Sequence, residues 1–190
     1  MPVQEPGTRP HRPTSYQLHA DVTVNRTTSQ VTVALSNAGT VGASLAVYPD
    51  AILTFGATPF TVLPSAPRSY VWDATLTAGK YAFSVYGPDG FLTSFAGTVV
   101  PAGQDSGPVP VVTATLRSGT VELTLANEGQ QQVTYTLTPN DFKGHTQTVA
   151  VTGGKSKAIG WPTDQDGYYD VVITATSAGG FRRRYAGRIA

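Results

Sequence analysis

The strongest constraint on the fold is an internal repeat, in which four short blocks of sequence return in the same order about 90 residues later. The blocks and their copies are Val31–Gly39 and Val121–Gly129, Trp72 and Trp161, Gly79–Val85 and Gly167–Ile173, and Gly90–Gly97 and Gly180–Gly187. Such a period is too long for a solenoid unit, and it suits a complete small β-sandwich of roughly 100 residues. The repeat therefore predicts two copies of one domain in tandem.

Apolar and polar residues alternate within each copy, as in strands that bury one face. The stretch Leu18–Val24 shows this period of two, and about seven such runs occur in each copy. The pattern predicts antiparallel sheets with one side in water. The 20 glycines and 14 prolines supply turns, for example Gly87-Pro-Asp-Gly90,. The predicted fold class is therefore all-β, with two small antiparallel β-sandwiches of immunoglobulin or fibronectin type.

Segments rich in proline and glycine set the expected domain boundaries. Residues 1–15 contain Pro2, Pro6, Gly7, Pro10 and Pro13, so we expect an extended segment there,. Residues 101–110 are polar and hold three prolines, which indicates a linker,. The first repeat is accordingly assigned to residues 16–100 and the second to residues 111–190.

The repeated residues have structural interpretations. We expect Trp72 and Trp161 to lie in the cores between the sheets, with a ligand platform as the alternative. Gly97 and Gly187 are expected to allow a bend or a close backbone contact in the last strand. The side-chain carbonyls of Asn37 and Asn127 are expected to close turns.

A search for chemistry finds no catalytic motif, and no cofactor is expected. The chain has no cysteine, so disulfides, cysteine metal sites and a cysteine nucleophile are excluded,. His11, His19 and His145 are far apart in sequence, which argues against a histidine metal site. Asp164-Gln-Asp166-Gly167 resembles a calcium loop but lacks its ligand spacing, so a solvated turn is the preferred interpretation,. A net charge of +1 gives no general attraction to nucleic acid,.

One basic cluster is a candidate contact for an anionic surface: Arg182, Arg183 and Arg184, with Arg188 close behind. Arginine suits phosphate, so a contact with a lipid headgroup or with nucleic acid is one interpretation, although three arginines make a small footprint. The first copy has Leu92-Thr-Ser94 at the matching places, so the charge is not part of the shared fold. The alternative is that these arginines are solvated or locally ion-paired.

The stretch Tyr81–Phe91, followed by Phe95-Ala-Gly97, resembles a pattern in one enzyme family. It is similar to the C-terminal repeats of bacterial phosphocholine-preferring phospholipases C, of the non-haemolytic and haemolytic type. The second copy keeps Gly180-Phe181 and Tyr185-Ala-Gly187 but lacks the Gly-Pro-Asp part. The leading segment Gln4–Pro10 also resembles the stretch that leaves the catalytic domain in this family.

The resemblance implies a parent enzyme that cleaves phosphatidylcholine or sphingomyelin and is secreted. Residues 1–15 would then be the linker from a catalytic domain that this sequence does not contain, and no catalytic residue can be carried over. The chain would be an accessory module that binds a phospholipid surface or a partner. The alternative is that the repeats pack on the catalytic domain, the expected partner within the same protein, and stabilise it.

Overall fold

The computed structural model describes residues 15–50, 56–176 and 178–189, so most of the expected leading segment at 1–15 lies outside the described residues. The first repeat contains β1 (Leu18–Asn25), β2 (Gln30–Asn37), β3 (Ala43–Tyr48), β4 (Thr58–Val62), β5 (Arg68–Asp73), the short 3-10 helix η1 (Ala74–Thr77), β6 (Lys80–Tyr86) and β7 (Leu92–Thr98). The second contains β8 (Pro110–Arg117), β9 (Thr120–Asn127), β10 (Val133–Asp141), β11 (Gln147–Val151), β12 (Lys155–Pro162), β13 (Tyr168–Thr176) and β14 (Arg182–Arg188).

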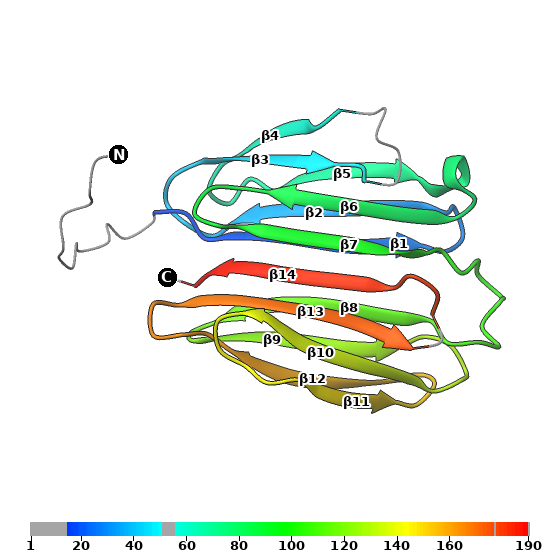
Figure 1. Ribbon diagram of the computed structural model, residues 1–190. Coiled ribbons are helices and arrows are strands. Elements are labelled where there is room, and N and C mark those ends of the chain that lie inside the picture. The colour runs from blue at the N-terminus through cyan, green and yellow to red at the C-terminus, as the bar shows by residue number, and fades with distance from the viewer. Residues whose placement is uncertain (1–14, 51–55, 177, 190) are drawn as a thin grey trace, which may run out of the picture.

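Each repeat is a sandwich of a three-stranded layer on a four-stranded layer (Figure 1). In the first repeat β1-β2-β5 covers β4-β3-β6-β7, and in the second β8-β9-β12 covers β11-β10-β13-β14. Neighbouring strands are antiparallel, and alternate residues such as Val31, Val33 and Leu35 are fully buried between the layers. The predicted fold class is confirmed. No helix in the described part of the chain is long and apolar enough to cross a membrane.

The two sandwiches join through their last strands, because β7 pairs with β14 to make one sheet of eight strands. The pairing is symmetric: Ser94 lies opposite Arg184, which holds the same place in its own repeat, while Arg182 faces Ala96 and Ala186 faces Leu92. The first strands also meet, since the amide of Ala114 in β8 donates to Asp21 in β1 at 3.0 Å. The repeats are thus related by an approximate two-fold axis. We call this junction of β1, β7, β8 and β14 the seam.

The repeated residues hold each sandwich together in the same way. Trp72 and Trp161 are buried, at 6% and 0% exposure, which confirms that they are core residues. The side-chain oxygen Oδ1 of Asn37 accepts hydrogen bonds from the backbone amides of Gln17 and Gly39, at 3.1 and 2.9 Å. The corresponding bonds of Asn127 come from Val109 and Gly129, at 3.2 and 3.0 Å. The predicted turn-closing role is therefore confirmed.

The two glycines of the last strands make the close contact that the sequence predicts. A Cβ atom at Gly97 would lie 2.7 Å from the Tyr81 hydroxyl, and one at Gly187 would lie 3.1 Å from the Tyr169 hydroxyl. Each glycine therefore leaves room for the tyrosine that faces it across the sheet.

The segment between the repeats is attached to both of them. The amide of Ala102 donates to the Arg26 carbonyl at 3.0 Å, and the amide of Gln130 donates to the Asp105 carbonyl at 2.8 Å. Strand β8 begins at Pro110, inside the range 101–110 that the sequence assigns to the linker. The backbone groups of this polar segment are thus partly satisfied by loops of both repeats,.

Candidate functional site

The arginines of β14 lie on two sides of the sheet, as the alternation of a strand requires. Arg182 is exposed, and its Nη1 donates to the Ser94 hydroxyl at 3.3 Å. Arg184 is half-buried, and its Nε and Nη2 donate to the two carboxylate oxygens of Asp170 at 2.9 and 2.6 Å. Hydrogen bonding to Asp170 is the main reason why the pKa of Arg184 is raised. Asp170 also accepts from the Asn140 amide at 2.9 Å, so the ion pair belongs to a bonded network.

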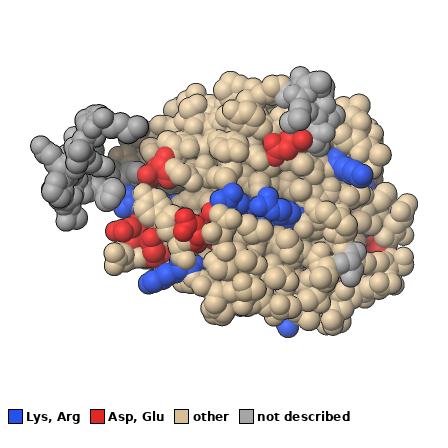
Figure 2. All heavy atoms as spheres, in the orientation of Figure 1, with Lys and Arg blue, Asp and Glu red and all other residues tan. Residues whose placement is uncertain are grey.

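Arg188 lies near the end of β14 and is half-buried. Its Nε donates to the Asp166 carbonyl at 2.8 Å, and its guanidinium lies 5.4 Å from the ring centre of Tyr168. On the face shown in Figure 2 the Lys and Arg side chains form no large continuous patch, and acidic groups lie beside those over the seam. Contact with an anionic surface stays a prediction, and Arg182 is the most exposed of the four arginines.

Arg183 points into the protein and is only 3% exposed, so it cannot contribute to a surface contact in this conformation. Its Nη1 donates to the Ala96 carbonyl at 2.7 Å, and its Nη2 donates to the Tyr81 hydroxyl at 2.7 Å. The guanidinium lies 4.2 Å from the ring centre of Phe181. Ala96 and Tyr81 belong to the first repeat, so the side chain connects the two sandwiches across the seam.

The Arg183 guanidinium has no counter-charge among the described residues, since none of the ion pairs found there includes it. Its Nε is buried and has no hydrogen-bond partner. Carbonyl, hydroxyl and ring contacts orient the cation without neutralising it. The seam therefore contains a buried guanidinium that has no carboxylate partner among the described residues.

Asp21 connects the two repeats between β1 and β8. Its carboxylate accepts from the Val22 amide at 2.8 Å, from the Ala114 amide at 3.0 Å and from the Tyr185 hydroxyl at 2.9 Å. Burial raises the pKa of Asp21, although the Ala114 bond opposes the shift. His19 lies 4.0 Å away, and burial lowers the pKa of its imidazole.

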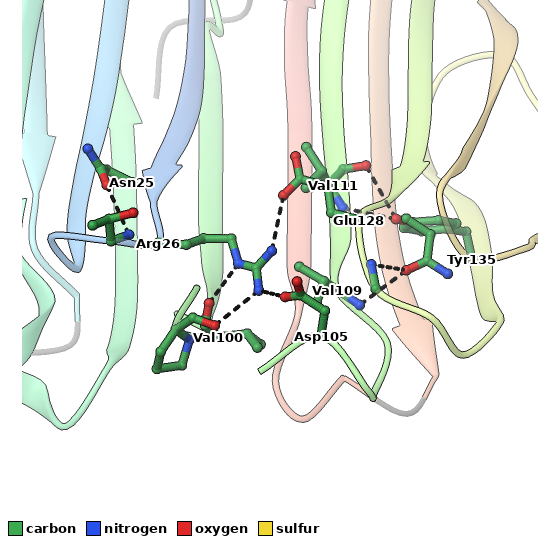
Figure 3. A network of polar contacts seen from close by, with 12 residues as sticks. Asn25, Arg26, Val100, Asp105, Val109, Val111, Glu128 and Tyr135 are labelled. Carbon is green, nitrogen blue, oxygen red and sulfur yellow. Dashed lines mark hydrogen bonds and ion pairs between the residues drawn. The ribbon is translucent and has the colours of Figure 1, made fainter. Parts of the chain in front are cut away.

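Arg26 closes the end of the seam where the linker crosses (Figure 3). It reaches from the first repeat and donates to the Val100 carbonyl through Nε at 2.7 Å. The same guanidinium forms ion pairs with Asp105 in the linker and with Glu128 in the second repeat, the latter at 3.8 Å. One side chain thus joins both sandwiches and the segment between them, and its charge is balanced.

A cavity of about 450 Å³ lies in the seam, and both repeats line it. Most of its wall is apolar, with side chains that include Val22, Val24, Tyr81, Val109, Val111 and Phe181. The charged residues of the wall are Arg26, Glu128 and Arg183. We call this space the seam cavity. A wall of this kind suits a ligand with an apolar body, since few polar groups would have to be desolvated.

The remaining polar candidates do not converge. His11 lies outside the described residues, and no group of three His, Cys, Asp or Glu side chains that could hold a metal occurs in the described part. Asp164 accepts from the amides of Asp166 and Tyr168 at 3.0 and 2.8 Å, so this carboxylate closes a turn. The polar residues of the seam can therefore orient and neutralise charges.

The family is decided by a match over almost the whole sequence. The model of the family described as bacterial phospholipase C, C-terminal domain, matches residues 10–98 and 107–188, once for each repeat. The chain belongs to this family.

Its relatives within the family carry this region as a minor part of their length. A non-hemolytic phospholipase C from Burkholderia pseudomallei (strain K96243) is 29% identical over the whole chain, which covers 27% of that protein. A hemolytic phospholipase C from Pseudomonas aeruginosa is 28% identical, again over the whole chain, which covers 29% of it. The chain thus spans between a quarter and a third of these relatives and corresponds to their C-terminal part.

Two solved structures match most of the chain at low sequence identity. A red sea bream transglutaminase matches 94% of the chain with a TM-score of 0.29 and 10% identity, and the match covers 32% of that protein. The FN1–FN3 domains of chicken CNTN1 match 90% of the chain with a TM-score of 0.28 and 14% identity, covering 67% of that structure.

Three residues outside the basic cluster, Asp21, Asp170 and Arg26, make contacts that the sequence did not predict. Asp21 and Asp170 occupy outward positions of ordinary alternating strands, where a charged residue is expected to meet water. Arg26 follows β1 and looks like a turn residue. The available signal was a mismatch between the copies: by strand register Asp21 corresponds to Thr113, and Asp170 corresponds to Ala82.

Proposed function

We propose that this chain is the non-catalytic C-terminal region of a secreted phospholipase C that cleaves phosphatidylcholine or sphingomyelin. In this proposal the two repeats act as one rigid unit that packs on the catalytic region and stabilises it. The observation that carries the proposal is that the side chains of Arg183 and Arg184 form their hydrogen bonds and ion pair inside the protein. These side chains hold the seam and the sheet together, so half of the basic cluster serves the internal structure.

The end of the molecule where the described chain begins is the favoured contact for the catalytic region. Ser15 accepts there from the amides of Thr40 and Val41, at 2.7 and 3.1 Å. The ring of Phe142 is 46% exposed and stacks on Tyr168 with the ring centres 5.4 Å apart. Exposed aromatic rings beside an arginine are typical of strong interface contacts. In this proposal the catalytic region precedes Ser15 in the chain, so it would lie close to the rings of Phe142 and Tyr168.

The test uses the full-length phospholipase C that carries this chain. Deletion of residues 16–190 is expected to lower the thermal midpoint of the catalytic region, as measured by differential scanning calorimetry. Phe142→Asp is expected to act in the same direction, whereas Leu76→Asp, at the opposite end of the first repeat, should not. A truncated enzyme with unchanged midpoint and activity would remove the proposal.

A second candidate, binding to a phospholipid surface, rests on Arg182. This side chain is exposed and forms no ion pair among the described residues. The purified chain should then sediment with anionic vesicles at low salt and less well with phosphatidylcholine vesicles. Arg182→Ser should weaken this binding, and Arg117→Ser serves as a control on an exposed arginine elsewhere. Absence of sedimentation at low salt excludes this candidate.

A further inference from the structure

We propose that the seam cavity binds an organic monoanion with an apolar body, such as a medium-chain aliphatic carboxylate. The proposal does not depend on the function of the parent enzyme, because it concerns a site formed by the two repeats alone. It rests on three properties of this cavity, which are its volume, its wall and an arginine, Arg183, that has no carboxylate partner among the described residues.

The volume and the wall define the body of the ligand. A space of about 450 Å³ falls within the usual range of small-molecule sites,. Valine, proline and aromatic side chains form most of the wall, including Val24 from the first repeat and Val111 from the second. An aliphatic chain placed here would leave water for an apolar surface, which is favourable by roughly 25 cal/mol for each Å² removed from water.

The charge of Arg183 defines the polar group of the ligand. Arg183 lines the cavity and is 3% exposed, and its guanidinium has neither a carboxylate partner nor an acceptor for its Nε among the described residues. A buried charge is expected to be paired, because an unpaired one is costly to remove from water. An anion that enters the cavity supplies the missing negative charge.

The other charged residues of the wall support a single negative charge on the ligand. Arg26 already has two carboxylate partners, Asp105 and Glu128, so it adds no free positive charge. Among the described residues, Arg183 is therefore the positively charged wall residue that lacks a carboxylate partner. A dianion would bring a second negative charge close to Glu128, which also lines the cavity.

The test compares octanoate with 1-octanol and acetate on the purified chain by isothermal titration calorimetry. Octanoate is expected to bind at least about tenfold more tightly than 1-octanol, a difference of about 1.4 kcal/mol. Acetate has the charge without the apolar body and is expected not to bind. Equal affinity for octanoate and octanol, or no saturable octanoate binding, would overturn the proposal.

Two variants locate the site, and a third is a control. Arg183→Met is expected to abolish the preference for octanoate over octanol while octanol still binds. Val111→Trp fills the cavity without touching the arginine and is expected to remove binding of both. Arg117→Met changes an arginine that is 62% exposed on β8 outside the cavity and should leave both affinities unchanged. Unchanged binding in Val111→Trp would place the octanoate elsewhere and refute the assignment, even if Arg183→Met is too unstable to measure.

Discussion

The two repeats share the residues that build a sandwich and differ in the residues that join one sandwich to the other. Trp72 and Trp161 fill equivalent cores, and Asn37 and Asn127 close equivalent turns. At the seam the correspondence ends. Thr93 in the first repeat stands where the second has Arg183.

The neighbouring position, Ser94 in the first repeat and Arg184 in the second, differs for an electrostatic reason. Ser94 and Arg184 face each other near the two-fold axis, so an arginine in both copies would place two positive charges directly opposite each other. Like charges at such positions destabilise a sheet. An arginine in only one copy avoids the repulsion and leaves a small partner opposite it. A symmetric backbone contact therefore requires asymmetric side chains.

The largest predicted effect concerns the shared positions. Trp72→Ala and Trp161→Ala are each expected to lower the free energy of unfolding by about 3–5 kcal/mol, because each leaves a cavity in a packed core. If the seam makes the repeats one cooperative unit, each variant shows a single urea transition by both circular dichroism and fluorescence. Two separate transitions would show that the repeats unfold independently.

The second prediction compares equivalent positions that differ. Arg183→Met is expected to lower the free energy of unfolding by about 2–4 kcal/mol, because the Ala96 carbonyl and the Tyr81 hydroxyl lose a buried donor. Thr93→Val should change the free energy of unfolding by less than about 0.5 kcal/mol, since the buried Thr93 hydroxyl has no hydrogen-bond partner,. Urea midpoints of both variants check this contrast. Similar losses at both positions would contradict the asymmetric seam.

The third prediction concerns pH. Burial raises the pKa of Asp21, so the folded state binds the proton more tightly than the unfolded state. Stability from this group should therefore fall as the pH rises above about 3.9, the ordinary value for aspartate, and become constant above its folded pKa.

The measurement is the urea midpoint across this range for the His19→Gln protein with and without Asp21→Asn. The background removes His19, whose pKa is lowered by burial and whose titration therefore reduces stability as the pH falls below about 6.5,. Asp21→Asn should abolish the remaining decline in stability. A decline that persists in the double variant must come from another group.

The smallest effect is expected at the two-fold axis. Ser94→Lys places a second cation opposite Arg184 and should be less stable than Ser94→Glu by roughly 0.5 kcal/mol. The difference should shrink in 1 M salt, because screening weakens interactions between exposed charges. Thermal midpoints of the two variants at low and high salt provide the measurement. A difference that does not change with salt would indicate a steric cause.

The sequence was sufficient for the strands, the core and the turns, because these depend on local alternation and on residues that recur in both copies. Leu18–Val24 alternates as a strand must, and Gly97 recurs as Gly187. The seam was not predictable in this way. Its contacts join residues as far apart as Asp21 and Tyr185, and none of them leaves a periodic signal. Strand alternation places Arg183 on the opposite side of the sheet from Arg182 and Arg184, but the partners of Arg182 and Arg183 in the first repeat leave no signal in the sequence,.

The pairing of β7 with β14 also affects how readily a single repeat would aggregate. Each of these strands has seven residues, and in isolation each would leave a row of unpaired backbone donors and acceptors open to another chain,. The outermost strands of the joined sheet, β4 and β11, have only five residues each and offer a shorter template. A single repeat, released by cleavage in the linker at 101–109, would therefore be prone to self-association. In the duplicated chain, β7 and β14 cover each other's edges, which protects both repeats against aggregation.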